Sequence, residues 1–540
     1  MIRIKFLMPF SILLTLNVLQ SLAQPEIIWN KCFGGIAGDA FNDTKLTLDN
    51  GYICLGGSNS NDADLEGVCC PQGGTDFWIV KLDSNFNIKW EKLIGTTYDL
   101  DIAGKIYLNS DTTYTIFGTA NTNTGDCNCN HSGSQDIWMI TLNDTGFITS
   151  QKCFGGSSFD ILMDVSKCND NSYILSASSG SSDGDVGIHY GSEFSSDAFI
   201  MKVSSTGEIQ WTKTIGGSGY EGAYVAGISA NRCLINVATT SHDFDFESLM
   251  PPDETFGRWV FITDSVGNIL IDTLLKMYDD DLELNFPFEY EPNQFLLLGA
   301  NRIDTGLFEG NKGSNDATIG ILNENLSLYK IIQFGGSKSD EFYQVFKESE
   351  STYYFFGTTY SSDFDAQESH GEDNDAFIVK TDSGFNKIWS KSFGATGSDK
   401  VCSIYDHLSK LIVFGSSNVY GPNDVDITNA HYDNLVGNNS EAWVMTIEQP
   451  DQISHYTDQN NIKIYPNPAH STLFVNSLNN INSSIEILIT DLLGRNYFEN
   501  QFSFEEKKLS IDIGYLIPGI YIVSITDSKN QYYNYKLIVQ

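Results

Sequence analysis

The chain has 540 residues, and its 69 Asp and Glu outnumber 31 Lys and Arg, giving a formal net charge of −38 at pH 7. So acidic a protein repels nucleic acid and anionic membrane surfaces, and both are excluded as expected partners. The excess of carboxylates instead suits a soluble protein that works outside the cell.

The N-terminus has the features of a signal peptide. Arg3 and Lys5 precede an apolar stretch over residues 6–19, and Ser21-Leu22-Ala23 supplies small residues at the cleavage positions. We therefore predict a signal peptide over residues 1–23. No other apolar run is long enough for a membrane-spanning helix, so we expect no transmembrane segment.

Seven copies of a unit of roughly sixty residues follow the leader. A glycine turn after an apolar residue marks most copies, at Phe33-Gly34-Gly35, Ile94-Gly95, Phe154-Gly155-Gly156, Ile215-Gly216-Gly217, Phe334-Gly335-Gly336 and Phe393-Gly394. A second marker is a small residue that closes an apolar run, and it recurs at Gly56, Gly118, Ala177, Ala238, Gly299, Gly357 and Gly415. Periods of this length indicate a solenoid or a propeller.

Each copy contains four strand-like runs. In the first copy they cover residues 39–48, 51–57, 76–83 and 87–94. They are short, rich in β-branched and aromatic residues, and bounded by Gly, Asn, Asp and Ser, which is typical of strands. We call them the first to fourth runs of a unit.

The last copy lacks its fourth run. It supplies runs near 399–406, 409–415 and 441–448, whereas residues 27–33 at the start of the mature chain match the missing run. Pairing the two ends would leave few open sheet edges. The sequence therefore predicts an all-β fold over residues 24–448, a seven-bladed β-propeller closed by an N-terminal strand.

All eight tryptophans occupy two positions of the repeat. Such a set could form a sugar-binding platform, but recurrence at equivalent places favours packing between blades, since aromatic side chains dominate core energetics by area. They are Trp29, Trp90, Trp211 and Trp389 in the fourth run, and Trp78, Trp138, Trp259 and Trp443 in the third.

The loop between the second and third runs carries a repeated Asp-x-Asp pair. Alternate carboxylates in a Gly/Ser/Asn-rich loop could converge on calcium, a hard cation that takes about 6–8 oxygen ligands. The alternative is that these side chains cap local turns. The candidate calcium ligands are Asp62, Asp64, Asp183, Asp185, Asp243, Asp245, Asp363, Asp365, Asp424 and Asp426.

A second acidic series follows the glycine turn, and histidines occur in the long loops. The acids could ring the mouth of the propeller channel, or each could bond the backbone of its own turn. The histidines could serve metal ligation or acid–base chemistry, or be loop residues of the repeat. The acids are Asp39, Asp99, Asp160, Glu221, Asp280, Asp340 and Asp399, and the histidines His131, His189, His370 and His431, with His131 and His370 preceding Asp136 and Asp375.

The repeat ends near residue 448, and the C-terminus differs from it. Residues 449–461 form a polar linker, and residues 462–540 contain about seven further strand-like runs that predict a small Ig-like β-sandwich. Its landmarks are Tyr465-Pro466-Asn467-Pro468, Gly494-Arg495 and Pro518-Gly519 followed by Tyr521.

These landmarks, in this order, resemble the type A sorting domain of the type IX secretion system. The resemblance implies recognition by the type IX translocon, removal of the domain by a sorting peptidase, and release or attachment at the cell surface. The expected location is therefore secreted or outer cell surface, after transit through the periplasm.

The sequence names no reaction. It contains no Gly-x-Ser-x-Gly elbow, His-Glu-x-x-His motif or phosphate-binding glycine loop, and it predicts no catalytic residue and no cofactor besides calcium. One hypothesis is a non-enzymatic binding module, an adhesin or a glycan or protein binder that depends on calcium. The alternative is a hydrolase that acts on polysaccharide through carboxylates at the channel mouth, which one odd, buried carboxylate with a raised pKa would favour.

Overall fold

The computed structural model describes residues 25–539, and the chain divides into two compact units, residues 1–450 and 451–540. The predicted signal peptide and nearly all of the predicted linker lie outside the described residues and stay predictions. Not described are 1–24, 66–73, 97–100, 110–111, 121–124, 129–133, 193, 277–281, 305, 350–351, 368, 408–409, 432–438, 450–461, 466–470, 478–483, 492–494, 504–507, 518, 528–531 and 540.

Within its described residues, the first unit consists of seven four-stranded antiparallel sheets and one short hairpin, β28 (Asn423–Asp424) with β29 (Ile427–Thr428). The first three sheets are β2 (Asp39–Leu46), β3 (Tyr52–Ser58), β4 (Asp76–Leu82) and β5 (Ile88–Ile94); β6 (Ile102–Leu108), β7 (Tyr114–Ala120), β8 (Asp136–Leu142) and β9 (Ile148–Phe154); and β10 (Asp160–Lys167), β11 (Tyr173–Ser179), β12 (Asp197–Val203) and β13 (Ile209–Ile215). The next three are β14 (Glu221–Ile228), β15 (Arg232–Thr239), β16 (Gly257–Thr263) and β17 (Ile269–Lys276); β18 (Leu282–Glu291), β19 (Gln294–Asn301), β20 (Asp316–Leu322) and β21 (Leu328–Phe334); and β22 (Asp340–Ser349), β23 (Thr352–Thr359), β24 (Asp375–Asp382) and β25 (Lys387–Phe393).

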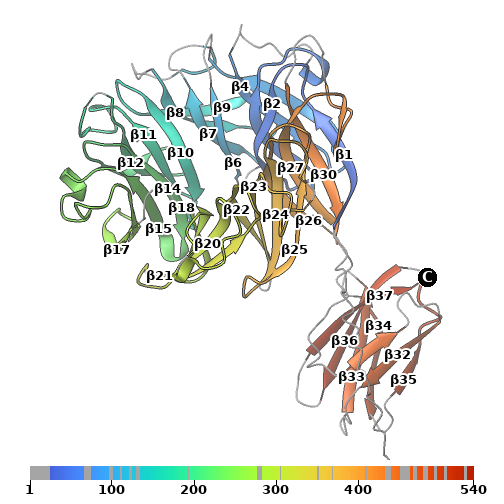
Figure 1. The fold of residues 1–540 in the computed structure, drawn as a ribbon. Helices are drawn as coiled ribbons and strands as arrows, with labels where there is room; N and C mark the ends of the chain where they lie inside the picture. The colour runs from blue at the N-terminus through green and yellow to red at the C-terminus, as the bar shows by residue number, and fades with distance from the viewer. Residues whose placement is uncertain are drawn as a thin grey trace, which may run out of the picture. The chain divides into compact units, whose positions relative to one another are not determined.

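The seventh sheet joins the two ends of this unit. Its order is β1 (Glu26–Phe33), β30 (Asn439–Glu448), β27 (Lys410–Val419) and β26 (Asp399–His407). β1 runs antiparallel to β30, with Glu26 opposite Glu448 and Phe33 opposite Ala442. In Figure 1 the blue β1 lies beside the orange β30. The N-terminal strand thus takes the place of the run that the last copy lacks.

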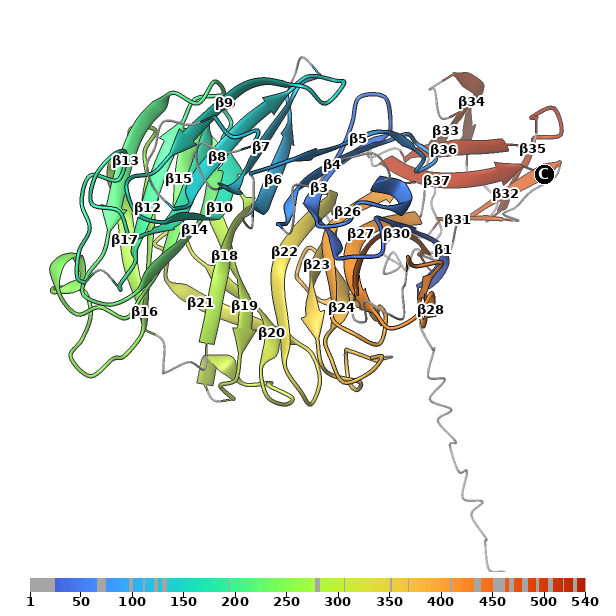
Figure 2. The same ribbon diagram turned by 90° about the horizontal axis from the view of Figure 1, so that it is seen from above.

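Buried apolar clusters join each sheet to the next in chain order, a succession that Figure 2 shows from above. A further cluster joins the first sheet to the seventh and contains Phe41, Trp78 and Phe414, with ring centroids 5.2 Å apart for Phe41 and Trp78 and 6.4 Å apart for Phe41 and Phe414. The prediction of an all-β chain of repeated four-stranded sheets is therefore confirmed.

The tryptophans pack between sheets, as predicted. Trp78, Trp138 and Trp443 are fully buried. The outer Trp90 donates its Nε1–H to the Asp144 carbonyl in the next sheet at 2.9 Å, and Trp211 does the same to Ser265 at 3.2 Å. A residue that recurs in the repeat here serves the contact between repeats.

The second unit has two sheets around a shared core. One is formed by β31 (Ile462–Tyr465), β32 (Thr472–Ser477) and β35 (Lys508–Asp512), and the other by β34 (Asn496–Ser503), β33 (Ser484–Asp491), β36 (Gly519–Asp527) and β37 (Tyr532–Val539). Val475, Ile487 and Val523 are among the core side chains. Of the landmark residues, Tyr465, Arg495, Gly519 and Tyr521 are described, and Tyr521 is buried and donates its hydroxyl to the Ile517 carbonyl at 2.8 Å. Pro466, Asn467, Pro468, Gly494 and Pro518 lie outside the described residues.

Helical structure in the described residues is limited to single turns. They include Ala63–Leu65, Ser229–Asn231, Phe244–Phe246 and Gly306–Phe308. Over this part of the chain no helix has the length and apolar character needed to cross a membrane.

Candidate functional site

The Asp-x-Asp pairs bind the glycine turn by which the chain enters their sheet. In the first sheet, the Ile36 N–H donates to Asp62 Oδ1 at 2.8 Å and the Gly34 N–H to Asp64 Oδ2 at 3.3 Å. These are turn contacts of the kind proposed as the alternative to calcium. The same pattern joins Ser157 to Asp183, Gly155 to Asp185, Ser218 to Asp243, Gly216 to Asp245, Ser337 to Asp363, Gly335 to Asp365 and Gly394 to Asp426, while Asp424 accepts from Tyr420 and Thr396.

The middle residue of each pair lies in the left-handed region. Gly184 takes this conformation at φ 63°, and it suits glycine because no side chain is present. Phe244, Phe364 and Val425 take it at φ 50°, 51° and 54°, although a left-handed L-residue costs about 1–2 kcal/mol. All three side chains are exposed, so no burial offsets the strain.

Replacing one of these residues by glycine is expected to stabilise the protein. Phe364→Gly removes the strain and loses little packing, because the ring is 59% exposed, and should raise the free energy of unfolding by about 1 kcal/mol. The reverse change, Gly184→Ala, places a Cβ 2.4 Å from the Gly155 carbonyl oxygen and should lower the free energy of unfolding by at least as much. Urea denaturation of both variants checks this, and a destabilised Phe364→Gly would show that the ring packs on something.

The second acidic series binds its own turn. Gly35 donates to Asp39 at 2.7 Å, and the same contact joins Gly156 to Asp160, Gly217 to Glu221, Gly336 to Asp340 and Ala395 to Asp399. In the second copy of the repeat, the corresponding contact is made by Asp101, which accepts from the Thr96 N–H at 2.6 Å. Asp99 and Asp280 lie outside the described residues.

A third set of carboxylates lies at the start of the third strand in five sheets and at the third residue of β30 in a sixth. Of this set, only Asp136 and Asp375 are marked in the sequence by a histidine five residues earlier. Every member is buried, and the set comprises Asp76, Asp136, Asp197, Asp316, Asp375 and Glu441. Both oxygens of Asp136 lack a hydrogen-bond partner among the described atoms. Burial and the nearby Asp160 and Asp185 raise the pKa of Asp136 to about 7. The signal in the sequence that could have revealed this set is an acid at the start of the third run in six of the seven copies.

The described loop histidines face these acids. The His189 Nδ1 lies 3.0 Å from Asp197, the His370 Nδ1 3.3 Å from Asp375, and the His431 Nδ1 2.7 Å from Glu441. The hydrogen bond to Glu441 raises the pKa of His431. His131 lies outside the described residues. Recurrence in three loops fits the expected repeat role.

The described residues contain no group of three His, Cys, Asp or Glu side chains arranged to hold a metal ion. Each Asp-x-Asp carboxylate named above accepts at least one backbone N–H group, Asp424 also accepts a hydroxyl, and Asp365 also pairs with Lys312 and Lys387. Calcium binding by this chain stays a prediction.

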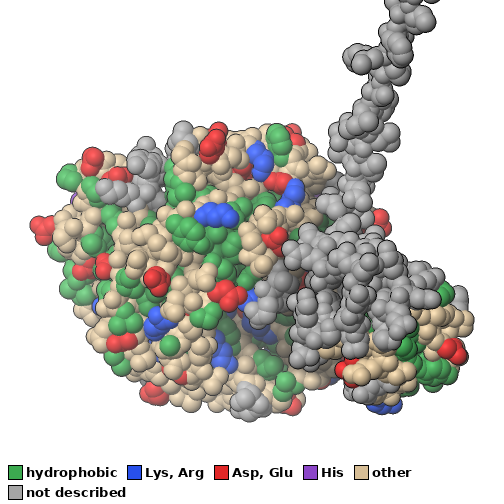
Figure 3. Space-filling model, turned by 90° about the horizontal axis from the view of Figure 1, so that it is seen from below, with side chains coloured by type: hydrophobic (Ala, Val, Ile, Leu, Met, Phe, Trp, Pro, Cys, Tyr) green, Lys and Arg blue, Asp and Glu red, His purple; other side chains and the backbone are tan. Residues whose placement is uncertain are grey.

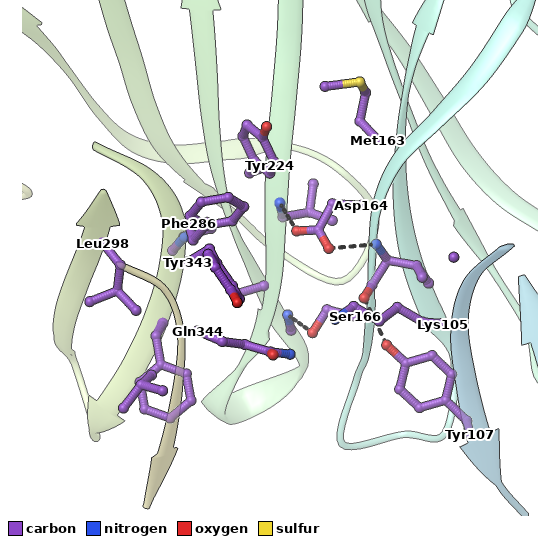
Figure 4. A pocket seen from close by; sticks show the side chains of 18 of the residues that line it. Lys105, Tyr107, Met163, Asp164, Ser166, Tyr224, Phe286, Leu298, Tyr343 and Gln344 are labelled. Carbon is purple, nitrogen blue, oxygen red and sulfur yellow. Dashed lines mark hydrogen bonds between the residues drawn. The ribbon is translucent and has the colours of Figure 1, made fainter. Parts of the chain in front are cut away.

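A cavity of about 620 Å³ lies where the first strands of all seven sheets meet. β2, β6, β10, β14, β18, β22 and β26 each contribute to its wall, and Figure 4 shows part of the lining. Unlike the residues of the glycine turns, the lining differs from sheet to sheet. This is where the repeat loses its symmetry.

One side of the cavity carries a row of aromatic rings. The Tyr224 and Phe286 centroids are 4.7 Å apart, and those of Phe286 and Tyr343 are 6.5 Å apart. Lys400 continues the row, with Nζ 5.3 Å from the Tyr343 ring centroid. Figure 4 shows the three rings in succession, across the cavity from Asp164, Lys105 and Tyr107. We call Tyr224, Phe286 and Tyr343 the aromatic row.

Asp164 is a carboxylate in the cavity wall that has a raised pKa. Burial raises its pKa to about 6, and the positive charge of Lys105 opposes this rise. However, its oxygens accept backbone N–H groups of Val165 at 2.8 Å and Val225 at 3.1 Å. Asp43 makes the same two kinds of contact, to Thr44 and to Ile106 of the next sheet, both at 3.0 Å. Asp164 therefore clamps the adjacent sheet.

On the face in Figure 3, acidic and basic side chains are scattered among apolar ones. The net negative charge of the chain is not gathered into one patch on this face. The cavity, with its aromatic row, is the part of the described surface where the side chains differ most between the repeats.

Comparison with known proteins identifies the C-terminal unit. Residues 463–540 match the family of the secretion system C-terminal sorting domain. The chain therefore carries this sorting domain, and the protein is secreted or displayed at the cell surface. The predicted resemblance is confirmed.

The chain also has more distant likenesses. The chain is 26% identical over 155 residues to an endo-acting ulvan lyase of Formosa agariphila, a match that spans 28% of this chain and 30% of that relative's length. Similar solved structures include the parainfluenza virus 5 hemagglutinin-neuraminidase ectodomain (8% identity, TM-score 0.32, 65% of this chain and 83% of that one) and a Bacteroides vulgatus protein of the duf4221 family (10%, 0.31, 79% and 96%). The Bombyx mori GH32 β-fructofuranosidase is another (9%, 0.25, 96% and 89%).

Proposed function

We propose that residues 24–448 form a closed seven-bladed β-propeller that acts as a secreted, non-enzymatic binding module, with its ligand site in the central cavity. The observation that carries the proposal is the aromatic row on an otherwise repetitive scaffold. Evolution of a scaffold alone gives no reason to vary the innermost strands, whereas a binding site needs particular side chains at particular places. The pairing of β1 with β30, and the buried cluster between the first and last sheets, support the closed ring.

The ligand we propose is a glycan. Aromatic faces stack on the C–H faces of sugar rings, and Asn42, Ser166 and Gln344 add polar groups to the cavity lining. A cavity of about 620 Å³ falls in the usual range for sites that enclose small ligands. A polysaccharide context also agrees with the name of the curated relative, an ulvan lyase, although the match spans under a third of that protein.

Binding is favoured over hydrolysis by the role of Asp164. A glycoside hydrolase needs two carboxyl groups that flank the scissile bond. Asp164 has the raised pKa expected of an acid, but backbone N–H groups occupy both oxygens, and Asp43 repeats its contacts at another sheet. A polysaccharide hydrolase remains the second candidate because of this raised pKa.

The C-terminal unit, residues 462–540, supplies the export route. We propose the type IX translocon and a sorting peptidase as its partners, after cleavage of a signal peptide at residue 23 and passage through the periplasm. Calcium bound by the Asp-x-Asp loops is part of this proposal, and the experiment below includes it.

A polysaccharide panel tests the proposal on the mature chain. The full-length protein is screened for binding with calcium and with EDTA, and the bound glycans are analysed for cleavage. Retention without cleavage supports a binding module, and release of shortened products supports the hydrolase. Loss of binding in EDTA would support calcium dependence, and absence of binding to every polysaccharide would contradict a glycan ligand.

Removing a ring of the aromatic row is expected to weaken binding. Tyr224→Ala should reduce affinity for a glycan found in the panel by about tenfold, because a stacking contact is lost. Tyr220→Ala is the matched control, since Tyr220 is 63% exposed and does not line the cavity. Isothermal titration measures the affinity of both variants for the glycan. Equal affinities of Tyr224→Ala and Tyr220→Ala would show that the cavity is not the binding site.

A further inference from the structure

Two lysines enter the cavity from different sheets. Lys105 lies on β6 and is half-buried, and Lys400 lies on β26 and keeps an exposed surface although protein surrounds it in the cavity wall. The amide of Gln344 fits best with its oxygen accepting from Lys105 Nζ at 3.0 Å and its nitrogen donating to the Cys402 carbonyl at 3.1 Å. Lys400 lies over the Tyr343 ring, so one positive charge adjoins the aromatic row.

Neither lysine has an ion-pair partner among the described residues, taking 4.0 Å between nitrogen and oxygen as the limit. Other lysines of this acidic chain do find carboxylates: Lys45 pairs with Asp43 at 2.7 Å, and Lys312 with Asp365 at 2.6 Å. Enclosure by protein, and then the positive charge of Lys105, lower the pKa of Lys400, with Glu341 opposing them. The cavity therefore holds two neighbouring cations without an ion pair among the described residues, and the carboxylates that act on them, Asp164 and Glu341, lie beyond ion-pair distance.

An uncompensated pair of this kind is costly without a ligand. Like charges in an enclosed site repel more strongly than they would in bulk water. The net charge of −38 does not neutralise them, since charges farther away than about 8–10 Å are largely screened in physiological salt. An anion that enters the cavity would remove the repulsion and gain charge-assisted hydrogen bonds to both ammonium groups.

We propose that the ligand is an anionic saccharide, whose carboxylate or sulfate group binds Lys105 and Lys400 while its ring lies on the aromatic row. This inference rests on the proposed glycan-binding function and names the class of glycan. The adjacency of Lys400 and Tyr343 is what ties the anionic group to a ring. A small inorganic anion would bind the two lysines without contacting the aromatic row.

Matched ligands separate the class of glycan from glycan binding as such. Hexagalacturonate and its methyl ester share the same sugar rings and differ in charge, and a sulfated galactan oligosaccharide tests sulfate in place of carboxylate. By isothermal titration of the full mature chain, the acid or the sulfated ligand should bind at least tenfold more tightly than the ester. High salt should weaken the charged ligand and leave the ester unchanged.

Variants test the two lysines. Lys105→Met and Lys400→Met should each weaken the charged ligand by about tenfold and leave the ester unaffected, and Lys105→Arg should retain binding. Lys89→Met is the control, because Lys89 is exposed and pairs only with the exposed Asp49. Lys400→Met should also keep or raise the melting temperature of the free protein, since it removes repulsion. If Lys105→Met fails to fold, the melting temperature of Lys400→Met still shows that the second lysine variant is folded and can be used for the binding test.

The outcomes separate the two claims. Equal binding of acid, sulfated ligand and ester would overturn the anionic class and leave glycan binding intact. Binding of none of the three would overturn this inference, and a negative polysaccharide panel would then remove the proposed function as well. Preference for the charged ligand that survives both Met variants would overturn the assignment to Lys105 and Lys400.

Discussion

Raising the pH from 5 to 8 is expected to lower the melting temperature of the repeat unit by roughly 10 °C. The cause is a set of buried carboxyls whose pKa is raised by burial and then by neighbouring carboxylates. The pKa rises to about 7 for Asp76 and Asp136, and to about 8 for Asp399. Burial likewise raises the pKa of Asp316 and Glu441 to about 7 and that of Asp197 to about 6.

The direction follows from proton linkage. Between the unfolded pKa near 4 and the folded pKa near 7, the folded state binds more protons, so stability falls as the pH rises. Each carboxyl contributes up to about 4 kcal/mol to this change, and neighbours that share protons contribute less than the sum. The pKa of Asp365 and that of Asp170 are lowered, with Lys312 and Lys202 as their respective partners. These two carboxylates therefore change the stability only at more acidic pH.

Melting curves between pH 4 and 9 measure this effect, and Asp136→Asn identifies its source. Removing that charge should raise the melting temperature at pH 8 and flatten the pH profile, because neither Asp136 oxygen has a hydrogen-bond partner among the described residues. Asp83→Asn is the control, since Asp83 is an exposed turn residue that accepts from Asn85 and Asn87. A profile that is flat between pH 5 and 8 would contradict the prediction.

The same experiment addresses calcium. A divalent cation among these carboxylates would compensate their charge, so added calcium should restore the melting temperature at pH 8, and EDTA should lower it. If calcium has no effect at pH 8, the cation does not compensate the charge of these carboxylates.

The sheets could be predicted from the sequence because their signals are local. Each strand of the first sheet shows β-branched or aromatic residues between turn residues, and the glycine turn gives the period. The seventh copy lacks its fourth run, and residues 27–33 supply a spare one. Counting the runs in the sequence was enough to predict that the two ends pair. Roles in packing, such as that of Trp443, followed because recurrence and burial go together in a repeat.

The cavity could not be predicted because its strands break the alternation of side chains. β2 shifts register between Phe41 and Asp43, β6 between Ala103 and Lys105, and β10 between Leu162 and Asp164. A bulge moves the following side chains to the other face, so a two-residue period does not tell which residues face the axis. Lys105 and Lys400 therefore gave no signal in the sequence.

The carboxylate roles could be predicted only in part. The spacing showed that Asp62 and Asp64 recur, but a recurring carboxylate can hold a cation or a backbone N–H group. The structure separates these uses by distance, with Asp62 2.8 Å from the Ile36 nitrogen. It also shows that Asp101 makes the contact corresponding to that of Asp39 at the second turn, where the acid follows the donating residue by five positions and not by four as at Asp39.

Deleting residues 24–33 is expected to abolish folding of the repeat unit. The deletion removes β1 from the seventh sheet and leaves β30 with an open edge. It also removes Phe33, which is fully buried in the cluster between the first and seventh sheets. The loss should exceed the 5–15 kcal/mol that usually holds a domain together.

Moving the strand tests whether pairing alone is required. Because Glu26 lies opposite Glu448, the deleted segment can be placed after Glu448 through an Asn-Gly hairpin, ahead of the linker and sorting domain. This variant should regain the melting transition and a monodisperse elution profile, whereas a scrambled segment at the same place should not. Rescue requires the ends of the unit to meet within one sheet. A deletion variant that melts like the parent would show that folding of the repeat unit does not depend on β1.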